Sequence, residues 1–324
     1  YSIKITNKKA ILFINSNSNI HVENMFIKKI FYKITNLEKY NDYKINLAIQ
    51  KKIKWYNSGI QDQIIDIQKK IENQNELSFL HSGHSGDIVD SLAVIKEISK
   101  THKCNFYIES NKPIDVKYNK HPAGKVWLTE KMVNMMLPLL KRQKYIHNVD
   151  IYRDQKIDID LNLFKELAMN LGLCSRRWYF QVTGIHADLS EVTLDVEPHR
   201  EIRNKIVICR SARRNNYYIN YKFLKNYNNL LFIGLKYEYE LLKKEVPNLE
   251  FYDCSNFLEM ASIIKSSKFF IGNLSLAYAI AEGLKVPRLL EGLEEFPGMY
   301  PSGKNGYEFF FQGHFEKWFK YLSK

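Results

Sequence analysis

Two loops in this sequence combine glycine with side chains that could carry out catalysis or bind anions. The first is the 81–87 segment, His-Ser-Gly-His-Ser-Gly-Asp, between a predicted strand at 77–81 and a predicted helix at 88–99. Asp87 follows the carboxyl end of that strand, where open α/β sheets bind ligands, and its carboxylate could take a proton from an attacking hydroxyl. Alternatively, Asp87 only caps the helix. His81 and His84 lack a third ligand nearby in the sequence, so they do not by themselves predict a metal site.

The second loop follows a predicted strand at 269–272. Gly272, Asn273 and Ser275 form a small polar turn before an alanine-rich predicted helix at 274–284. A pyrophosphate fits such a helix N-terminus, with the Ser275 hydroxyl and backbone N–H groups as donors. Glu282, two turns further on, could meet ribose hydroxyls. The alternative is ordinary strand–turn–helix packing, with Asn273 as a cap.

A cluster of arginines follows a third predicted strand, at 205–209. The segment from Cys209 to Asn216 contains Arg210, Arg213 and Arg214, whose guanidinium groups could hold phosphates through paired hydrogen bonds. A basic surface loop would contain the same residues. Because parallel strands bring their carboxyl ends to one edge, we expect this loop to lie near the Asn273 turn.

The elements that must position these loops alternate between strand and helix. From residue 76 onward, short apolar runs alternate with segments of helical spacing, which is typical of parallel sheets covered by helices. Before residue 76 the pattern predicts a short strand at 11–14 and helices over 45–72. The other predicted strands lie at 105–109, 149–152, 230–234, 249–252, 288–290 and 307–311, and the other predicted helices at 132–144, 161–173, 238–245, 257–266 and 315–322.

Length, charge and the lack of a long apolar run limit the classes of protein to which this chain could belong. The chain has 324 residues, enough for two domains, and a net charge of +13 that favours anionic partners without forming a compact Lys/Arg block. Neither a membrane-spanning run nor a secretory signal is visible, so a cytoplasmic protein is expected, with peripheral contact at the inner face of a membrane as the closest association.

The four cysteines form no C-x-x-C pair, which favours reduced thiols over disulfides or zinc. Asp158-Ile-Asp160 matches a short metal pattern that is common by chance, and Trp178-Tyr179-Phe180 favours a buried core over base stacking.

Three passages resemble the GT-B glycosyltransferases, and within them the heptosyltransferase-like family 9. They are Gly86-Asp87-Ile-Val-Asp-Ser-Leu92, the segment 137–149, and the segment 270–287 with its Ile-Gly-Asn-Leu-Ser turn. The resemblance covers about residue 76 to the C-terminus. It implies an α/β fold of two Rossmann-like domains whose parallel sheets face a cleft. We therefore divide the chain into a mainly helical N-terminal extension at 1–75, an acceptor-side domain at 76–203 and a domain for the nucleotide sugar at 204–324.

The resemblance also implies an activity. A family 9 enzyme moves a sugar from a nucleotide diphosphate sugar to an acceptor hydroxyl with inversion and without a metal or other cofactor. Asp87 matches the proposed general base, and the loop that carries Gly83, His84 and Gly86 lies on the acceptor side. The positions assigned to the nucleotide and its phosphates are Arg210, Ser211, Arg213, Asn273, Leu274, Ser275 and Glu282.

The sequence departs from the family pattern at the turn that binds the donor. Asn273 replaces a carboxylate, Ser275 replaces glycine and Tyr278 replaces histidine, so the sugar and base of the donor are not fixed. Two alternatives stay open, a GT-B module that binds without catalysis and another GT-B enzyme such as a nucleotide-sugar epimerase. The acceptor is expected to be a glycan, a lipid-linked molecule or another hydroxyl compound, and an anionic one would suit the basic surface. Nucleic acid is not expected as a partner, since no motif for it is present.

Overall fold

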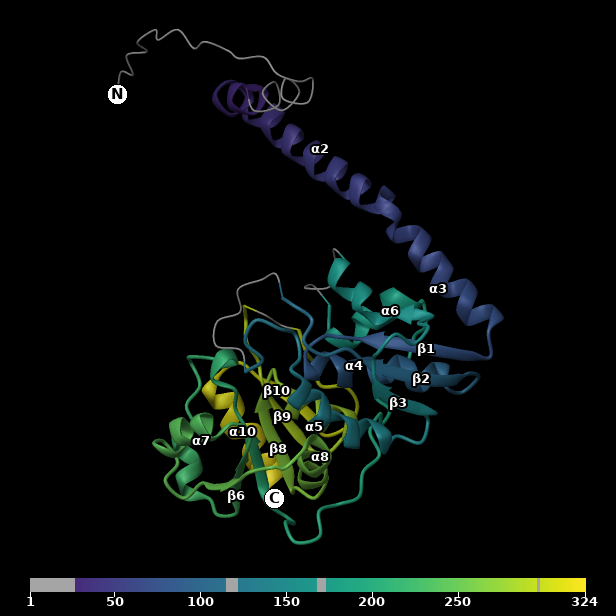
Figure 1. Cartoon of the computed structure of the whole chain (residues 1–324). Coiled ribbons are helices and arrows are strands. Elements are labelled where there is room, and N and C mark those ends of the chain that lie inside the picture. Colours follow the sequence, from purple (N-terminus) through teal and green to yellow (C-terminus); the bar gives the residue numbers. More distant parts are fainter. Residues whose placement is uncertain (1–26, 115–121, 168–172, 296–297) are drawn as a thin grey trace. The chain divides into compact units, whose positions relative to one another are not determined.

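The computed structural model describes residues 27–114, 122–167, 173–295 and 298–324 (Figure 1). The chain forms two compact units, residues 1–63 and 64–324. The strand expected at 11–14 lies outside the described residues. All of the candidate site residues lie in the second unit.

The first unit is helical wherever it is described. Residues 27–35 form one helix, and α2 (Leu37–Trp55) follows after Asn36, whose side chain accepts the Lys39 N–H at 2.9 Å and caps α2. A π-helical turn, η1 (Tyr56–Ile60), joins α2 to α3 (Gln61–Asn73), which continues into the second unit. Gly59 lies in this turn at a φ of 94°, a conformation that favours glycine. The helices predicted over 45–72 are therefore confirmed.

The first sheet has four parallel strands in the order β3-β2-β1-β4. They are β1 (Glu76–His81), β2 (Lys103–Ile108), β3 (Asn148–Ile151) and β4 (Ile159–Asp160). The accompanying helices are α4 (Ser85–Ile98), α5 (Glu130–Lys141), the 3₁₀ helix η2 (Leu161–Glu166) and α6 (Ser175–Thr183). β1 is buried on both faces, as expected of a central parallel strand, and it delivers the His81–Asp87 loop at its carboxyl end.

The second sheet has six parallel strands in the order β10-β9-β8-β5-β6-β7. Along the chain, the first three strands of this sheet are added toward one edge, and the next three are added toward the other edge. This is the strand order of a Rossmann sheet. The strands are β5 (Ile206–Cys209), β6 (Leu230–Ile233), β7 (Glu250–Tyr252), β8 (Phe269–Asn273), β9 (Arg288–Glu291) and β10 (Gly306–Phe309). The helical elements are η4 (Ala212–Arg214), η5 (Lys222–Asn226), α7 (Lys236–Lys243), α8 (Phe257–Lys265), α9 (Leu276–Leu284) and α10 (Gln312–Ser323).

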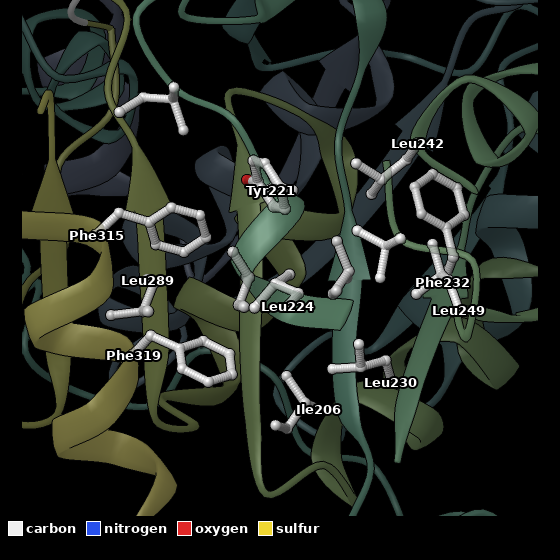
Figure 2. Packing of buried hydrophobic residues seen from close by; sticks show 14 of the residues in the cluster. Ile206, Tyr221, Leu224, Leu230, Phe232, Leu242, Leu249, Leu289, Phe315 and Phe319 are labelled. Carbon is white, nitrogen blue, oxygen red and sulfur yellow. The ribbon is translucent and has the colours of Figure 1, made fainter. Parts of the chain in front are cut away.

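The core of the second sheet is aliphatic and aromatic. Figure 2 shows Ile206, Leu230 and Phe232 of the central strands among side chains from the flanking helices. The Phe309 and Phe315 rings stack with centroids 4.2 Å apart, which fixes α10 against β10. Burial of such side chains contributes about 1.5–3 kcal/mol each, so this core holds the strand ends in place.

Three elements differ from the sequence prediction. β4 has only two residues, too few to show an alternating pattern. The helix predicted at 161–173 is a 3₁₀ helix that ends at Glu166, because Leu167 takes an extended conformation, and residues 168–172 lie outside the described part. α6 was not predicted as a helix, because all of it except Arg177 and Gln181 is buried, which leaves only a narrow polar face to reveal its period. Trp178, Tyr179 and Phe180 lie in α6 and are buried, so the core interpretation is confirmed.

Candidate functional site

The carboxyl ends of β5 and β8 form the point at which the strand order of the second sheet reverses, where open α/β sheets bind ligands. The Asn273 side chain joins the two loops there. Its Oδ1 accepts the Ser211 N–H at 2.9 Å, and its Nδ2 donates to the Ser211 carbonyl at 2.8 Å. Asn273 is fully buried, so its amide fixes the two loops and is not directed at a ligand. The expected direct contact between this side chain and a phosphate does not fit the geometry.

The first sheet has an equivalent reversal point between β1 and β4. There the Ser82 N–H and hydroxyl both donate to Asn162 Oδ1, each at 2.8 Å. Asp160 Oδ1 in turn accepts from the Asn162 backbone and side chain at 2.9 and 2.7 Å. In both sheets a buried asparagine therefore holds the loop after the first strand to the loop after the fourth.

The two reversal points face each other across the junction of the sheets. α4 packs against α9, so the two helix N-termini come together. A β-carbon added at Gly86 would lie 3.8 Å from Leu276 Cα, which is ordinary van der Waals contact. The structure thus brings together the two glycine-bearing loops that the sequence singled out, although 189 residues separate Gly86 from Ser275.

A chain of hydrogen bonds fixes the His81–Asp87 loop. The Gly83 N–H donates to His81 Nδ1 at 2.9 Å, which makes Nε2 the protonated nitrogen of a neutral imidazole. His81 Nε2 then donates to Tyr179 Oη at 2.8 Å, and Tyr179 donates to the Asp87 carbonyl at 2.8 Å. Burial holds the pKa of His81 well below its usual value, in keeping with the neutral form. Only glycine fits at position 83, because a β-carbon there would lie 2.6 Å from His81 Cε1.

Asp87 lies at the third position of α4 and is half-buried. Asp87 Oδ2 accepts the His84 N–H at 3.0 Å, so Asp87 caps α4 from its third position, whereas the N-cap itself is His84 and not Asp87. Burial raises the pKa of Asp87, and the nearby charges of His84, Lys165 and Arg214 oppose that rise without cancelling it. A carboxylate with a raised pKa beside a loop junction has the properties of a general base, and capping does not preclude that role.

Lys165 and Trp127 complete the first-sheet side of the site. The Lys165 ammonium lies over the Trp127 ring, 4.2 Å from its centroid, and donates to Asn162 Oδ1 at 3.0 Å and Ser82 Oγ at 3.2 Å. Burial lowers the pKa of Lys165 to about 8, with Asp87 among the groups that oppose the shift. His84 packs beside the same Trp127 ring, with ring centroids 4.8 Å apart.

Arg213 and Arg214 supply positive charge from the second-sheet side. Both lie in η4, directly after the Ser211 loop, and both are partly exposed. Burial lowers the pKa of His84, and the charge of Arg213 lowers it further. The charge of Arg214 acts on Asp87 in the same way. The electrostatic influence of η4 therefore reaches the loop of the first sheet.

Arg210 is placed differently from the expectation. Its Nε and one terminal nitrogen bind the two carboxylate oxygens of Glu291 at 2.7 and 2.8 Å, and Glu291 is fully buried. The guanidinium carbon lies 4.5 Å from the centroid of the Tyr221 ring. An ion pair inside the domain thus binds two of the three guanidinium nitrogens of Arg210, and the predicted phosphate contact of this residue stays a prediction.

Glu282 also departs from the expectation. Its carboxylate is fully buried, and it pairs with Arg176 of α6, Arg288 of β9 and Lys285. The Ser302 N–H donates to it as well, at 3.0 Å. A carboxylate surrounded by three cations cannot reach a ribose. Instead, the Arg176–Glu282 pair connects a helix of the first sheet to a helix of the second.

Ser275 and Leu274 lie where the sequence placed them, in the turn before α9. Ser275 is the N-cap, and its Oγ accepts the Tyr278 N–H at 3.4 Å while donating to the Asn273 carbonyl at 3.0 Å. Leu274 lines a small pocket at the carboxyl ends of β9 and β10, together with Leu290, Glu291, Tyr300, Glu308 and Phe310. Tyr278 is buried behind the turn, so it does not extend from the helix terminus.

No group of three His, Cys, Asp or Glu side chains in the described residues could hold a metal ion. Asp158, one residue of the Asp-Ile-Asp pattern, accepts the Ser78 N–H at 3.0 Å, and Asp160 caps η2. Both carboxylates therefore have roles in the fold. All four cysteines are free thiols.

The sequence analysis missed Trp127, Lys165 and Arg176. Each is a single polar or aromatic residue in a segment without a motif, and each acquires its place only through contacts with residues far away in the chain. Only the place of Arg176 could have been predicted from the sequence. An arginine next to a run of buried aromatic residues requires a buried acidic partner, which here is Glu282.

The two sheets and their junction define a class of fold. Two parallel α/β sheets in one chain, with the reversal points of their strand orders facing each other, form the GT-B fold. The expected fold class is confirmed.

Two solved structures share this fold. One is a glycosyl transferase family 9 protein from Veillonella parvula, with a TM-score of 0.50, 11% identity, and coverage of 77% of this chain and 89% of that chain. The other is the ADP-heptose LPS heptosyltransferase II of E. coli, with a TM-score of 0.51, 11% identity, and coverage of 76% of this chain and 98% of that chain. At such identity the likeness shows the fold. No family model matches the sequence, and no curated protein matches it.

Proposed function

We propose that this protein is a glycosyltransferase that moves a sugar from a nucleotide diphosphate sugar to an acceptor hydroxyl, with inversion and without a metal ion. The observation that carries the proposal is the junction at which Gly86 meets Leu276. It places a carboxylate of one sheet beside a helix N-terminus of the other, which suits a reaction between two substrates. The two solved structures described above carry transferase names, and one is named for ADP-heptose.

The donor diphosphate would bind at the N-terminus of α9. This helix has nine residues, starts at the Ser275 cap and points its first-turn N–H groups toward the reversal point of the second sheet. With Arg210 and the Asn273 side chain bound internally, Arg213 and Arg214 are the cations of this loop that we assign to the phosphates. Both act at the position where negative charge grows as the nucleoside diphosphate leaves.

Asp87 would act as the general base. In one displacement the acceptor oxygen forms a bond to the anomeric carbon and loses its proton to the Asp87 carboxylate. The bond from that carbon to the diphosphate oxygen breaks, and the nucleoside diphosphate leaves with the electron pair. A single displacement inverts the anomeric centre. Burial raises the pKa of Asp87, and the charges of Lys165 and Arg214 oppose that rise.

The donor is tested by nucleotide binding. Thermal unfolding would be followed with ADP, UDP, GDP, CDP, dTDP and CMP. A ligand at a hundred times its Kd stabilises a protein by about 2.7 kcal/mol, so one nucleotide should raise Tm clearly. The Arg213→Ala/Arg214→Ala variant should lose that shift, and Arg153→Ala, a change at an exposed arginine, should keep it. No shift with any nucleotide would contradict the proposed donor site.

The base is tested by Asp87→Asn. Asparagine preserves the hydrogen bond from the His84 N–H, so the fold and nucleotide binding should persist. Turnover should fall by roughly 10²–10⁴-fold, the usual contribution of a general base. Unchanged turnover would refute the assignment.

A second candidate is a binding module that keeps the GT-B fold without catalysis. The internal use of Arg210 and Asn273 favours it, because two positions aligned with phosphate contacts serve the fold instead. Product analysis separates the possibilities. A transferase forms a new glycoside only when an acceptor is present, an epimerase converts the nucleotide sugar without one, and a binding module yields neither product.

A further inference from the structure

The segment from residue 27 to residue 56 has properties that the proposed transferase site does not require. The E. coli structure is covered over 98% of its length but matches only 76% of this chain, so about a quarter of the chain has no counterpart there. Within residues 27–56, the stretch 27–35 and α2 are helical, and none of the residues of α2 is buried.

Each helix of this segment has a row of apolar side chains along one side, although Leu37 and Leu47 of α2 lie outside its row. In α2, Ile45, Ile49 and Ile53 recur every four residues and are 57%, 45% and 48% exposed. In the preceding helix, Ile27, Ile30, Phe31 and Ile34 follow a spacing of three and four residues and are also exposed. Residues at such spacing share a helix face, so each helix presents an uncovered apolar stripe.

The remaining surface of the segment is strongly basic. Residues 27–56 contain eight lysines but only two acidic residues, Glu38 and Asp42. By the 100° turn per residue, Lys44, Lys51 and Lys54 lie opposite the isoleucines of α2, while Lys39 and Lys52 flank them. Most of these lysines have no acidic residue in the segment to neutralise them.

Tyrosine and tryptophan are also concentrated here. Tyr32, Tyr40, Tyr43, Trp55 and Tyr56 all lie in this stretch. These side chains have an apolar ring and a polar group, and they favour the boundary between lipid and water. No helix in the described parts of the chain is both long enough and apolar enough to cross a bilayer.

We propose that residues 27–56 bind the surface of an anionic phospholipid bilayer, with the Ile45–Ile53 stripe in the acyl boundary and the lysines facing the head groups. Basic residues, an apolar row and interfacial aromatic residues occur together in helices that bind a membrane surface. Lysines that flank the stripe bury their methylene stems and keep the ammonium group at the head groups. Charge favours lipid over a second copy of this chain, because two copies of so basic a segment repel each other.

The test is binding of the full chain to vesicles. Sedimentation would compare vesicles of phosphatidylcholine alone with an equal mixture of phosphatidylcholine and phosphatidylglycerol. The chain should bind the mixed vesicles and not the neutral ones, and added salt should release it. Vesicle binding needs neither donor nor acceptor, so this test is independent of the proposed transferase activity.

Two variants and two matched controls identify the surface. Lys51→Gln/Lys52→Gln/Lys54→Gln should weaken binding on the order of a hundredfold, whereas the same change at the exposed Lys317, Lys320 and Lys324 should have little effect. Ile49→Ser/Ile53→Ser should weaken it about tenfold or more, and serine at the exposed Val192 and Leu241 should not. Because the replaced side chains are exposed, circular dichroism should show the same helix content for every variant.

Three outcomes would overturn the proposal. The first is equal binding to neutral and mixed vesicles, and the second is binding that both helix variants leave unchanged. The third is no binding to either vesicle, with a dimer in solution that Ile49→Ser/Ile53→Ser dissociates. That result would assign the apolar stripe to a second copy of the chain.

Discussion

Glu282→Gln tests whether the buried ion cluster holds the two sheets together. The substitution keeps the size of the side chain and removes its charge. It leaves Arg176 and Arg288, both almost fully buried, without their carboxylate partner. Removal of one partner from a buried pair typically costs about 3–5 kcal/mol, because the remaining charges stay desolvated. For a unit of this size each kcal/mol lowers Tm by roughly 2–4 °C, so we expect a fall on the order of 10 °C.

Thermal unfolding followed by circular dichroism measures this fall. Glu250→Gln is the matched control, because Glu250 pairs with Lys205 at 2.8 Å on the surface, where its side chain is 57% exposed. That variant should change Tm by about 2 °C or less. If Glu282→Gln behaves like Glu250→Gln, the cluster does not stabilise the junction. If it lowers nucleotide affinity and leaves Tm unchanged, Glu282 is a ligand-binding residue and our placement of it is wrong.

The pH dependence of the same variant follows from the pKa of Glu282. Burial alone would raise this pKa, but the attraction of Arg176, Arg288 and Lys285 outweighs it, and the pKa is lowered. A carboxylate with a lowered folded-state pKa stabilises the protein above its unfolded-state pKa, and the stabilisation is lost as the pH falls through the folded-state value. The Tm difference between the wild-type protein and Glu282→Gln should therefore be full at pH 7 and should shrink below about pH 4.

Three further predictions concern the α4 side of the junction. Gly83→Ala should displace the His81 ring and lower Tm, while Gly86→Ala should be tolerated because its β-carbon meets only ordinary contacts, and equal Tm values would contradict this. Burial raises the pKa of Asp90 to about 7, so this group destabilises the folded state as the pH rises from about 4 to 7, and the Tm of Asp90→Asn relative to wild type should increase between pH 5 and pH 8. A constant difference would contradict the burial of an ionisable Asp90. Lys165→Met should move the acidic limb of the transferase pH profile to higher pH by removing a cation near Asp87, and Lys165→Arg should not; identical profiles would exclude an electrostatic role for Lys165.

Sequence reasoning located the strands and loops because their signals are local. The apolar run before Gly272 and the alanine-rich segment after it predict a strand, a turn and a helix from residues that are neighbours in the chain. The alternation of such units predicts parallel sheets, whose carboxyl ends then place Ser211 near Asn273. The short 3₁₀ helix η2 was predicted as a longer helix, and the largely buried α6 was not predicted, so the elements that carry Asn162 and Arg176 were not assigned correctly.

Arg210, Asn273 and Glu282 depart from their predicted positions for one physical reason. Each side chain is polar and follows or flanks a strand end, and the sequence cannot tell whether it meets a ligand or another part of the protein. Burial decides the matter, since a buried charge or amide must have a partner within the fold. All three have such partners, namely Glu291, the Ser211 backbone and the Arg176–Arg288 pair. Residues at the same junction that remain partly exposed, Asp87, Arg213, Arg214 and Ser275, are the ones whose proposed roles are compatible with the structure.

The two buried asparagines give a reason why the junction can be rigid and yet open to substrates. Asn162 and Asn273 each bind the backbone of the loop after the first strand of their sheet, at 2.8 and 2.9 Å. These bonds fix the loops from within the sheets, so the ends of α4 and α9 need no ligand to hold their positions. When the loops of a site are ordered before the substrates bind, little binding free energy is lost in ordering them. In the proposed mechanism, binding energy from the nucleotide is then available to stabilise the charge that develops on its diphosphate at the N-terminus of α9.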